Sequence, residues 1–403
     1  MRSERRSGGM RENWKQSDAA WRDPAEIISL WSDAGHVKPG LLKHKVAGNW
    51  WDVLDQTGVT LLVTREYEHL AIAMSCNRGR PRTSYIEVPH PSGIAINRRT
   101  GRVWMASTRN PNHVIEFRPV TADSGHLKRD ATSHARDTLV PARTWFLPGR
   151  TYLHELALIG GTLYGNAVGM NAVTRLDPEG ALAPEWWPAC IDGKRGKPRF
   201  ENNYLQLNSI AAGKTVRTSF FSASAEKIGA RRPGHQNFPV DRRGVIFSGK
   251  TREPVCRGLT RPHSARLYRS RIWVDNSGYG EVGYVDGERF ACVTAIPAWT
   301  RGLCFHGSIA FVGASRVIPR FSNYAPGLDV GKTVCGVFAI DARQGEVLGS
   351  ITWPGGNQVF AVDWIPGSRG GHFPFEPSDK NTVKRATDLF YSYQTQFRKE
   401  QSR

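Results

Sequence analysis

The sequence lacks the motifs that most readily mark membrane, zinc and redox proteins. Its six cysteines are scattered, and no two are spaced as C-x-x-C. No stretch approaches the roughly 18–20 apolar residues of a membrane span. The N-terminus is charged and has no apolar segment of the signal-peptide kind. We therefore expect reduced thiols and a cytoplasmic protein without a membrane span.

Familiar catalytic motifs are missing as well. The chain contains no G-x-S-x-G, no H-E-x-x-H and no Walker segment. Known catalytic motifs are thus mostly absent. Whether the protein is an enzyme is left open by the sequence, and no oligomeric state is indicated.

Acidic residues are too few to balance the basic ones. There are 36 Asp and Glu against 55 Lys and Arg, a formal net charge of +19, and such a balance attracts anionic partners. Much of the excess lies in the tails and connectors, where it forms a solvated surface. The chain has no long basic helix, no zinc-finger spacing and no aromatic-basic RNA-binding motif. These observations disfavour nucleic acid and favour an anionic small molecule or peptide.

Turn-forming and aromatic residues are abundant. The chain has 41 Gly and 24 Pro, which imply many turns, and 13 Trp, 11 Tyr and 17 Phe, which supply apolar surface for a core. This composition favours a turn-rich, all-β protein.

A repeated unit organises the chain. From Gly93, "GIAINRRTGRVWMASTRNPNHVIEF" contains three short strands joined by polar turns, and the same pattern recurs from Glu155, Ser209, Ser264 and Gly302. Units of this kind cannot bury both of their faces alone, so they must stack on one another. Radial stacking produces a β-propeller.

Six blades account for the repeats, with seven as the alternative. Five units have their own innermost strand, and a sixth is assembled from both ends of the chain: 58–74 and 84–90 supply outer strands, and "QVFAVDWIPG" from Gln358 supplies the innermost one. The predicted organisation is an N-terminal extension over 1–45, a propeller over 46–366 and a C-terminal extension over 367–403. Short helices are predicted in the extensions, over 23–31 and over 379–397.

The repeats place polar residues at the entrance of every innermost strand. In four units the polar residue lies three positions before the alanine of the innermost strand. In the other two units the equivalent position is found by counting from the strand that follows. The positions are Ser92, His154, Asn208, Gln358, His263 and Arg301. Because innermost strands line the central channel of a propeller, these side chains should converge at one mouth.

The residue types at this mouth suggest acid-base chemistry and anion binding. His154 and His263 are the candidate catalytic residues, because an imidazole titrates near neutral pH. Arg301 could hold a carboxylate, phosphate or sulfate in a bidentate fork. The other candidate ligand contacts are Ser92, Asn208 and Gln358, together with Glu155, Asn166 and Asp275. A divalent metal is conceivable at two histidines, but no clear carboxylate-rich motif supports it.

Several stretches resemble a bacterial family known as domain of unknown function 4915. They include "LLVTREYEHLAIAMS", "RTYLHELALIGGTLYGNAVGMNAV" and "WVDNSGYGEVG", and the resemblance extends over about residues 45–365. It implies a propeller-like fold and brings no established activity. A looser likeness is to metal-dependent six-bladed lactonases and lyases, whose carboxylate-rich metal ring is not clearly reproduced here.

Two functions follow from these expectations. In the first, the mouth of the channel binds a small or peptidic anionic ligand, and a histidine acts on it as a general acid or base. In the alternative, the protein is a non-catalytic scaffold that binds another protein or a glycan. Both use the same mouth.

Overall fold

The computed structural model describes residues 34–109, 111–120, 138–177 and 182–377, together with residues 12, 15 and 16. The helices predicted over 23–31 and over 379–397 lie outside these ranges. Two α-helices precede the first long strand, α3 (Pro39–Leu42) and α4 (Trp50–Thr57). No helix among the described residues is long and apolar enough to cross a membrane.

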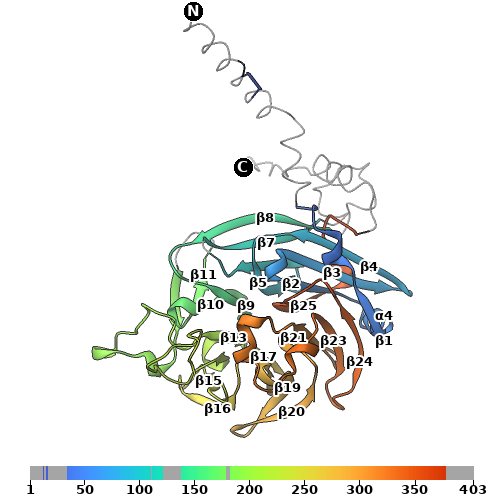
Figure 1. Cartoon of the computed structure of the whole chain (residues 1–403). Helices are drawn as coiled ribbons and strands as arrows, with labels where there is room; N and C mark the ends of the chain where they lie inside the picture. Colours follow the sequence, from blue (N-terminus) through green and yellow to red (C-terminus); the bar gives the residue numbers. More distant parts are fainter. Residues whose placement is uncertain are drawn as a thin grey trace, which may run out of the picture.

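Six antiparallel sheets surround one axis, so the predicted six-bladed β-propeller is confirmed (Figure 1). From the axis outward, the first blade contains β25 (Ala361–Pro366), β2 (Val59–Arg65), β3 (Leu70–Asn77) and β4 (Arg80–Glu87). The second contains β5 (Pro91–Asn97), β6 (Arg102–Ser107), β7 (Asn112–Val120) and β8 (Thr138–Leu147). The third contains β9 (Leu153–Ile159), β10 (Thr162–Ala167), β11 (Ala172–Leu176) and β12 (Leu182–Trp186).

The other three blades follow the same order. The fourth contains β13 (Leu207–Ala211), β14 (Phe220–Ala223), β15 (Gly244–Ser248) and β16 (Pro254–Leu259). The fifth contains β17 (Pro262–Tyr268), β18 (Arg271–Asn276), β19 (Glu281–Asp286) and β20 (Arg289–Ala295). The sixth contains β21 (Trp299–His306), β22 (Ile309–Ser315), β23 (Gly336–Asp341) and β24 (Val347–Thr352), with β1 (Lys45–Gly48) as an additional outer strand.

The ring closes through strands from the two ends of the described chain. β25 pairs with β2, with Ala361 opposite Thr64 and Pro366 opposite Val59. The six innermost strands contact one another in turn around the axis, and β25 completes this circle between β21 and β5. Closure leaves no free inner edge, which removes a template for unwanted strand pairing.

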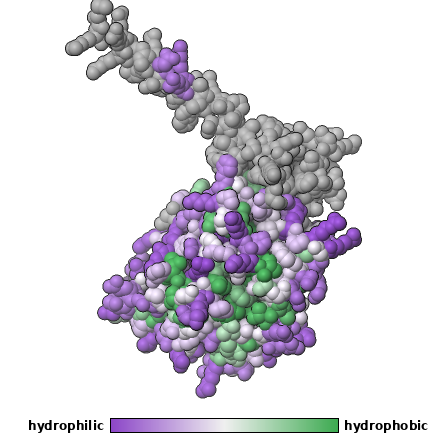
Figure 2. Space-filling model, turned by 45° about the vertical axis from the view of Figure 1, so that its right-hand side comes forward, coloured by the Kyte–Doolittle hydropathy of each residue, from purple (hydrophilic) through white to green (hydrophobic). Residues whose placement is uncertain are grey.

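Apolar side chains from neighbouring blades pack between the sheets. One large cluster joins α4 to the first, second and sixth blades and includes the fully buried Trp50, Phe311 and Trp353. On the face shown in Figure 2, hydrophilic residues predominate, and hydrophobic patches lie among them. All six cysteines are unpaired, and four of them are buried.

A β-bulge interrupts the innermost strand in five of the six blades. The unpaired residues are Ser92–Gly93, His154–Glu155, Asn208, Ser264–Ala265 and Arg301–Gly302. A bulge bends its strand and redirects a side chain out of the regular alternation. Four of the six positions predicted from the repeats are therefore the first residue of a bulge. His263 comes immediately before one, and Gln358 precedes β25.

Crowding at the axis explains the glycines within these bulges. A Cβ on Gly93 would lie 2.5 Å from the backbone nitrogen of Leu156 in the next blade. Gly302 has φ +95°, and a Cβ there would lie 2.9 Å from the backbone nitrogen of Val362. The innermost strands approach each other too closely at these points for any side chain.

We predict that Gly302→Ala lowers the free energy of unfolding by about 2 kcal/mol or more, because it adds both backbone strain and a clash with β25. Gly287→Ala is the matched control. Gly287 also has a positive φ, +60°, but a Cβ there would meet nothing within 4 Å, so its cost should be about 1 kcal/mol. Urea denaturation measures both. Equal losses would show that the close approach to β25 is unimportant.

His372 is a buried histidine held by two hydroxyl groups. Its Nε2 lies 2.9 Å from Ser75 Oγ and its Nδ1 3.1 Å from Ser84 Oγ. Burial, aided by the charge of Arg82, lowers the pKa of His372 to about 3. Between that value and the unfolded pKa near 6.5, the unfolded chain binds one more proton than the folded protein at this site. The contribution of His372 to stability is therefore complete above pH 6.5 and is lost progressively as the pH falls.

We predict that His372 alone makes the unfolding free energy fall by about 1.4 kcal/mol for each pH unit below 6.5. Chemical denaturation at several pH values between 7.5 and 5 gives the slope of the unfolding free energy against pH. In His372→Gln this slope should be smaller than in the original protein by the contribution of one proton. His44→Gln, at an exposed position, should leave the slope unchanged. A slope unaltered by His372→Gln would mean that the folded protein binds a proton there.

Candidate functional site

A cavity of about 330 Å³ opens at one mouth of the central channel. Its wall is built by two kinds of connection that lie at the same end of every blade. One kind joins the second strand to the third, as at Glu66 and Thr108, and the other leads into the innermost strand, as at Tyr152, Arg261 and Gln358. The cavity is therefore a property of the ring rather than of any single blade.

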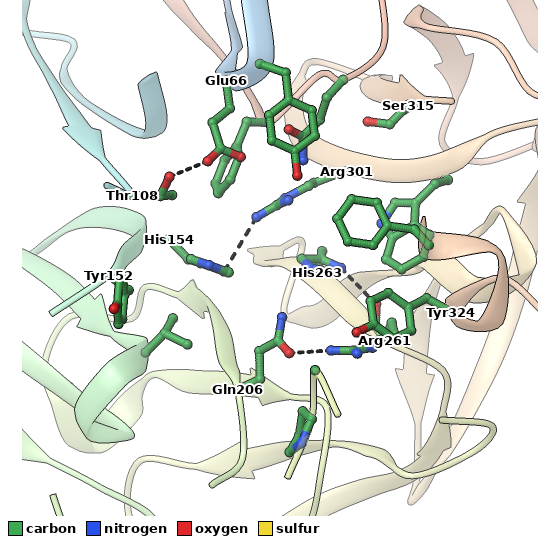
Figure 3. A pocket seen from close by; sticks show the side chains of 18 of the residues that line it. Glu66, Thr108, Tyr152, His154, Gln206, Arg261, His263, Arg301, Ser315 and Tyr324 are labelled. Carbon is green, nitrogen blue, oxygen red and sulfur yellow. Dashed lines mark hydrogen bonds between the residues drawn. The ribbon is translucent and has the colours of Figure 1, made fainter. Parts of the chain in front are cut away.

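The structure brings four of the predicted residues into this cavity. His154, His263, Arg301 and Gln358 all line it, and Figure 3 shows the first three pointing toward the same space. The four come from the third, fifth, sixth and first blades, respectively. Convergence at one mouth is thus observed for these residues.

The other predicted residues lie outside the cavity wall. Ser92 is fully buried and donates to the carbonyl of Leu153 in the next blade. Asn208 donates to the carbonyl of Pro262, also in the next blade, and to Ser224 Oγ. Asn166 accepts from the backbone N–H of Glu155 and donates to the carbonyl of Leu207. The side chains of these three residues form hydrogen bonds between adjacent blades or strands, so their role in the structure is to stabilise the ring.

Glu155 lies deeper in the channel than the residues that line the cavity. Its carboxylate is buried and pairs with Arg266, with both oxygens 3.2–3.3 Å from guanidinium nitrogens. Arg266 belongs to a second cavity at the opposite end of the innermost strands, lined also by Tyr268, Phe305 and Trp364. The Glu155–Arg266 pair therefore lies between the two mouths of the channel.

Asp275 is fully buried opposite His263 in the β17–β18 pairing. Neither carboxyl oxygen has a hydrogen-bond partner among the described residues. Burial raises its pKa well above the ordinary value for aspartate. Asp275 therefore lies behind His263, away from the residues that line the cavity.

Arg301 is buried, 8% exposed, and none of the described carboxylates pairs with it directly. With the amide of Gln358 oriented to satisfy both of its neighbours, Gln358 accepts from Arg301 Nη1 at 2.9 Å and donates to Glu66 Oε2 at 3.1 Å. The guanidinium lies over the ring of Phe360. Burial lowers the pKa of Arg301 to about 10, so it stays charged at pH 7.

Both histidines are neutral at pH 7. Burial, reinforced by the charge of Arg301, lowers the pKa of His154 and of His263 well below 6.5. The expectation of a pKa near neutrality is therefore wrong, because the cavity is both enclosed and positively charged. His154 Nδ1 lies 3.5 Å from Arg301 Nη2 and so serves as the acceptor toward this donor.

The tautomer of His263 follows from its neighbours. Its Nδ1 lies 2.8 Å from the carbonyl oxygen of Arg261, which can only accept. Nδ1 must therefore carry the proton, and Nε2 keeps a lone pair. Nε2 has no hydrogen-bond partner among the described residues, so His263 offers the cavity a neutral acceptor.

Arg261 is a cavity residue that the sequence pattern did not reveal. It is 2% exposed, its Nη1 donates to Gln206 Oε1, and its guanidinium lies 3.8 Å from the centre of the Tyr324 ring. Its Nε and Nη2 have no partner among the described residues. Burial lowers the pKa of Arg261 to about 10, and it remains charged at pH 7.

A backbone feature shared by four blades marks the position of Arg261. His90, Tyr152, Gln206 and Arg261 each adopt a left-handed conformation with φ of 45–53°, two residues before Ser92, His154, Asn208 and His263. Non-glycine residues rarely adopt this conformation, and it is often found near functional sites. The spacing of two residues was available in the sequence, but the conformation was not.

Positive charge dominates the cavity. Its wall holds one carboxylate, Glu66, and five arginines: Arg109, Arg232, Arg261, Arg301 and Arg316. Glu66 is buried, accepts from the Thr108 hydroxyl and lies 3.6 Å from Arg109 Nε. Arg261 and Arg301 therefore face the cavity without a carboxylate of their own. Within the described part of the chain, no three His, Cys, Asp or Glu side chains are grouped to hold a metal ion.

The protein is thus a six-bladed β-propeller with a basic cavity at one channel mouth. Residues 48–372 match the model of the family described as domain of unknown function DUF4915, and the chain belongs to that family. The resemblance seen in the sequence is confirmed. No curated protein sequence gives a significant match.

Solved structures with low sequence identity have a similar fold. A chain of a nidogen/laminin complex is 8% identical, covering 76% of this chain and 98% of that one, with a TM-score of 0.49. A gluconolactonase from Xanthomonas campestris is 14% identical, covering 74% and 86%, with a TM-score of 0.42. A luciferin-regenerating enzyme is 12% identical, covering 68% and 76%, with a TM-score of 0.39. These likenesses concern the fold, and no activity is carried over from them.

Proposed function

We propose that the protein binds a small or peptidic anionic ligand in the cavity at the channel mouth, with Arg301 and Arg261 as its anion contacts. The observation that supports this most directly is the burial of two guanidinium groups that share a cavity and lack carboxylate partners. Proteins rarely bury a charge without pairing it. An anionic ligand would supply the missing partner.

The energetics favour this arrangement. Removing an ion from water costs on the order of several kcal/mol, and a paired charge of opposite sign recovers part of that cost. Each guanidinium lies over an aromatic ring, Phe360 for Arg301 and Tyr324 for Arg261, which restricts its position. A fork held in place in this way binds a carboxylate or phosphate with little loss of side-chain freedom.

His263 is the residue we propose for proton transfer, as a general base. Its Nε2 lone pair can accept a proton from a bound hydroxyl or amide when a bound anion offsets the positive charge of Arg301, which otherwise lowers the pKa of this ring. His154, which accepts from Arg301, would orient that arginine. Anion binding requires neither proton transfer by His263 nor the orientation of Arg301 by His154, so the experiment below measures binding. We also propose a cytoplasmic location, which the six unpaired cysteines support.

We predict that Arg301→Met abolishes stabilisation by anions without unfolding the protein. The methionine keeps an apolar stem beside Phe360 and removes an unpaired buried charge, so the melting temperature without ligand should be unchanged or higher. Thermal denaturation in a series of carboxylates, phosphate and sulfate at constant ionic strength should show anion-dependent increases for the original protein, and these should disappear in the variant.

Arg98→Met is the control for this experiment. Arg98 lines the opposite cavity and pairs with Asp363 at 2.5 Å, so its loss should leave the anion response intact. Our proposal is contradicted if no anion stabilises the original protein, or if Arg301→Met unfolds it in the absence of ligand, because Arg301 would then be a structural residue.

A further inference from the structure

The two buried arginines of the cavity are held apart by different sets of neighbours. Arg301 belongs to the bulge of β21 in the sixth blade and contacts Gln358 and His154. Arg261 precedes β17 in the fifth blade and contacts Gln206 and, at 3.4 Å, Ser224. None of these contacts is shared. Each guanidinium is therefore fixed independently of the other.

A neutral group lies between the two charges. In the view of Figure 3, the ring of His263 lies between Arg301 and Arg261, and its Nδ1 is bonded to the backbone of Arg261. Aromatic side chains complete this part of the wall, including Trp299, whose ring centre is 5.9 Å from that of His263. The middle of the cavity therefore presents neutral and aromatic surface, with positive charge on either side.

The positions of the two arginines restrict the kind of ligand that can pair with both of them. An anion whose single charged group pairs with only one arginine leaves the other buried charge without an anionic partner, which is costly. A ligand with two anionic groups can pair with both. The two guanidinium groups have separate supports on separate blades and lie on either side of His263 in Figure 3, so a ligand with two separated anionic groups matches them. A cavity of about 330 Å³ limits the ligand to a small molecule or a short peptide end.

We infer that the ligand of this cavity is a compact dianion whose two anionic groups are separated by a short neutral segment, one group held by Arg301 and the other by Arg261. This inference rests on the proposed function, since it concerns the same cavity. It specifies the ligand class further: a dicarboxylate, or a carboxylate that also carries a phosphate or sulfate.

The test uses linear dicarboxylates from malonate to adipate, the monocarboxylates with the same numbers of carbons, and inorganic phosphate. Isothermal titration with the full chain, at pH 7.5 and constant ionic strength, gives the affinity for each. We expect one dicarboxylate length to bind about tenfold or more tightly than its matched monocarboxylate, because a second charged hydrogen-bonded pair forms. In Arg261→Met, and separately in Arg301→Met, that advantage should disappear. In Arg98→Met it should persist.

The outcomes separate this inference from the proposed function. If monocarboxylates bind as tightly as dicarboxylates of every length, anion binding stands and the two-group ligand is wrong. If phosphate binds most tightly and is lost with either arginine, one group bridges both forks, and the inference is also overturned. If none of these anions binds, the proposed function itself fails. The length series on the unaltered protein decides the first and third cases, so it does not depend on a variant that folds.

Discussion

The convergence of six innermost strands on one axis is the constraint on which the rest of the structure depends. Backbones there approach so closely that Gly93 and Gly302 leave no room for a Cβ. Bulges at this level in five blades turn residues such as His154 and Arg301 toward the channel. The packing that closes the ring therefore also determines which side chains can line the mouth.

The same crowding divides polar residues into two groups. Ser92 and Asn208 donate to carbonyls of the next blade, so they hold the ring together where backbone pairing is interrupted. Arg301 and Arg261 instead keep buried charges that no described carboxylate pairs with. Such stored electrostatic energy is what an anionic ligand would release on binding.

Much of the fold could be predicted, and less of the site. The repeats revealed the six blades. Counting from their alanines located first bulge residues at Ser92, His154 and Asn208, and counting from the downstream strand located Arg301. The same count could not tell which of these would face the cavity. Arg261 and Glu66 were missed because they lie in connections, where the residue type is not repeated even at the position of Arg261, which keeps its spacing in four blades. Their position depends on left-handed backbone and loop geometry, which leave no repeat in residue type.

The sequence by itself determined the class of fold, the number of blades and the positive charge, because strand and turn patterns are local and charge is additive. Tertiary structure alone decided which charges are buried, which are paired, and that His154 and His263 are neutral. Those properties depend on the distance between residues far apart in the chain, such as Arg301 and His154, and on the exclusion of water when the six blades close around them.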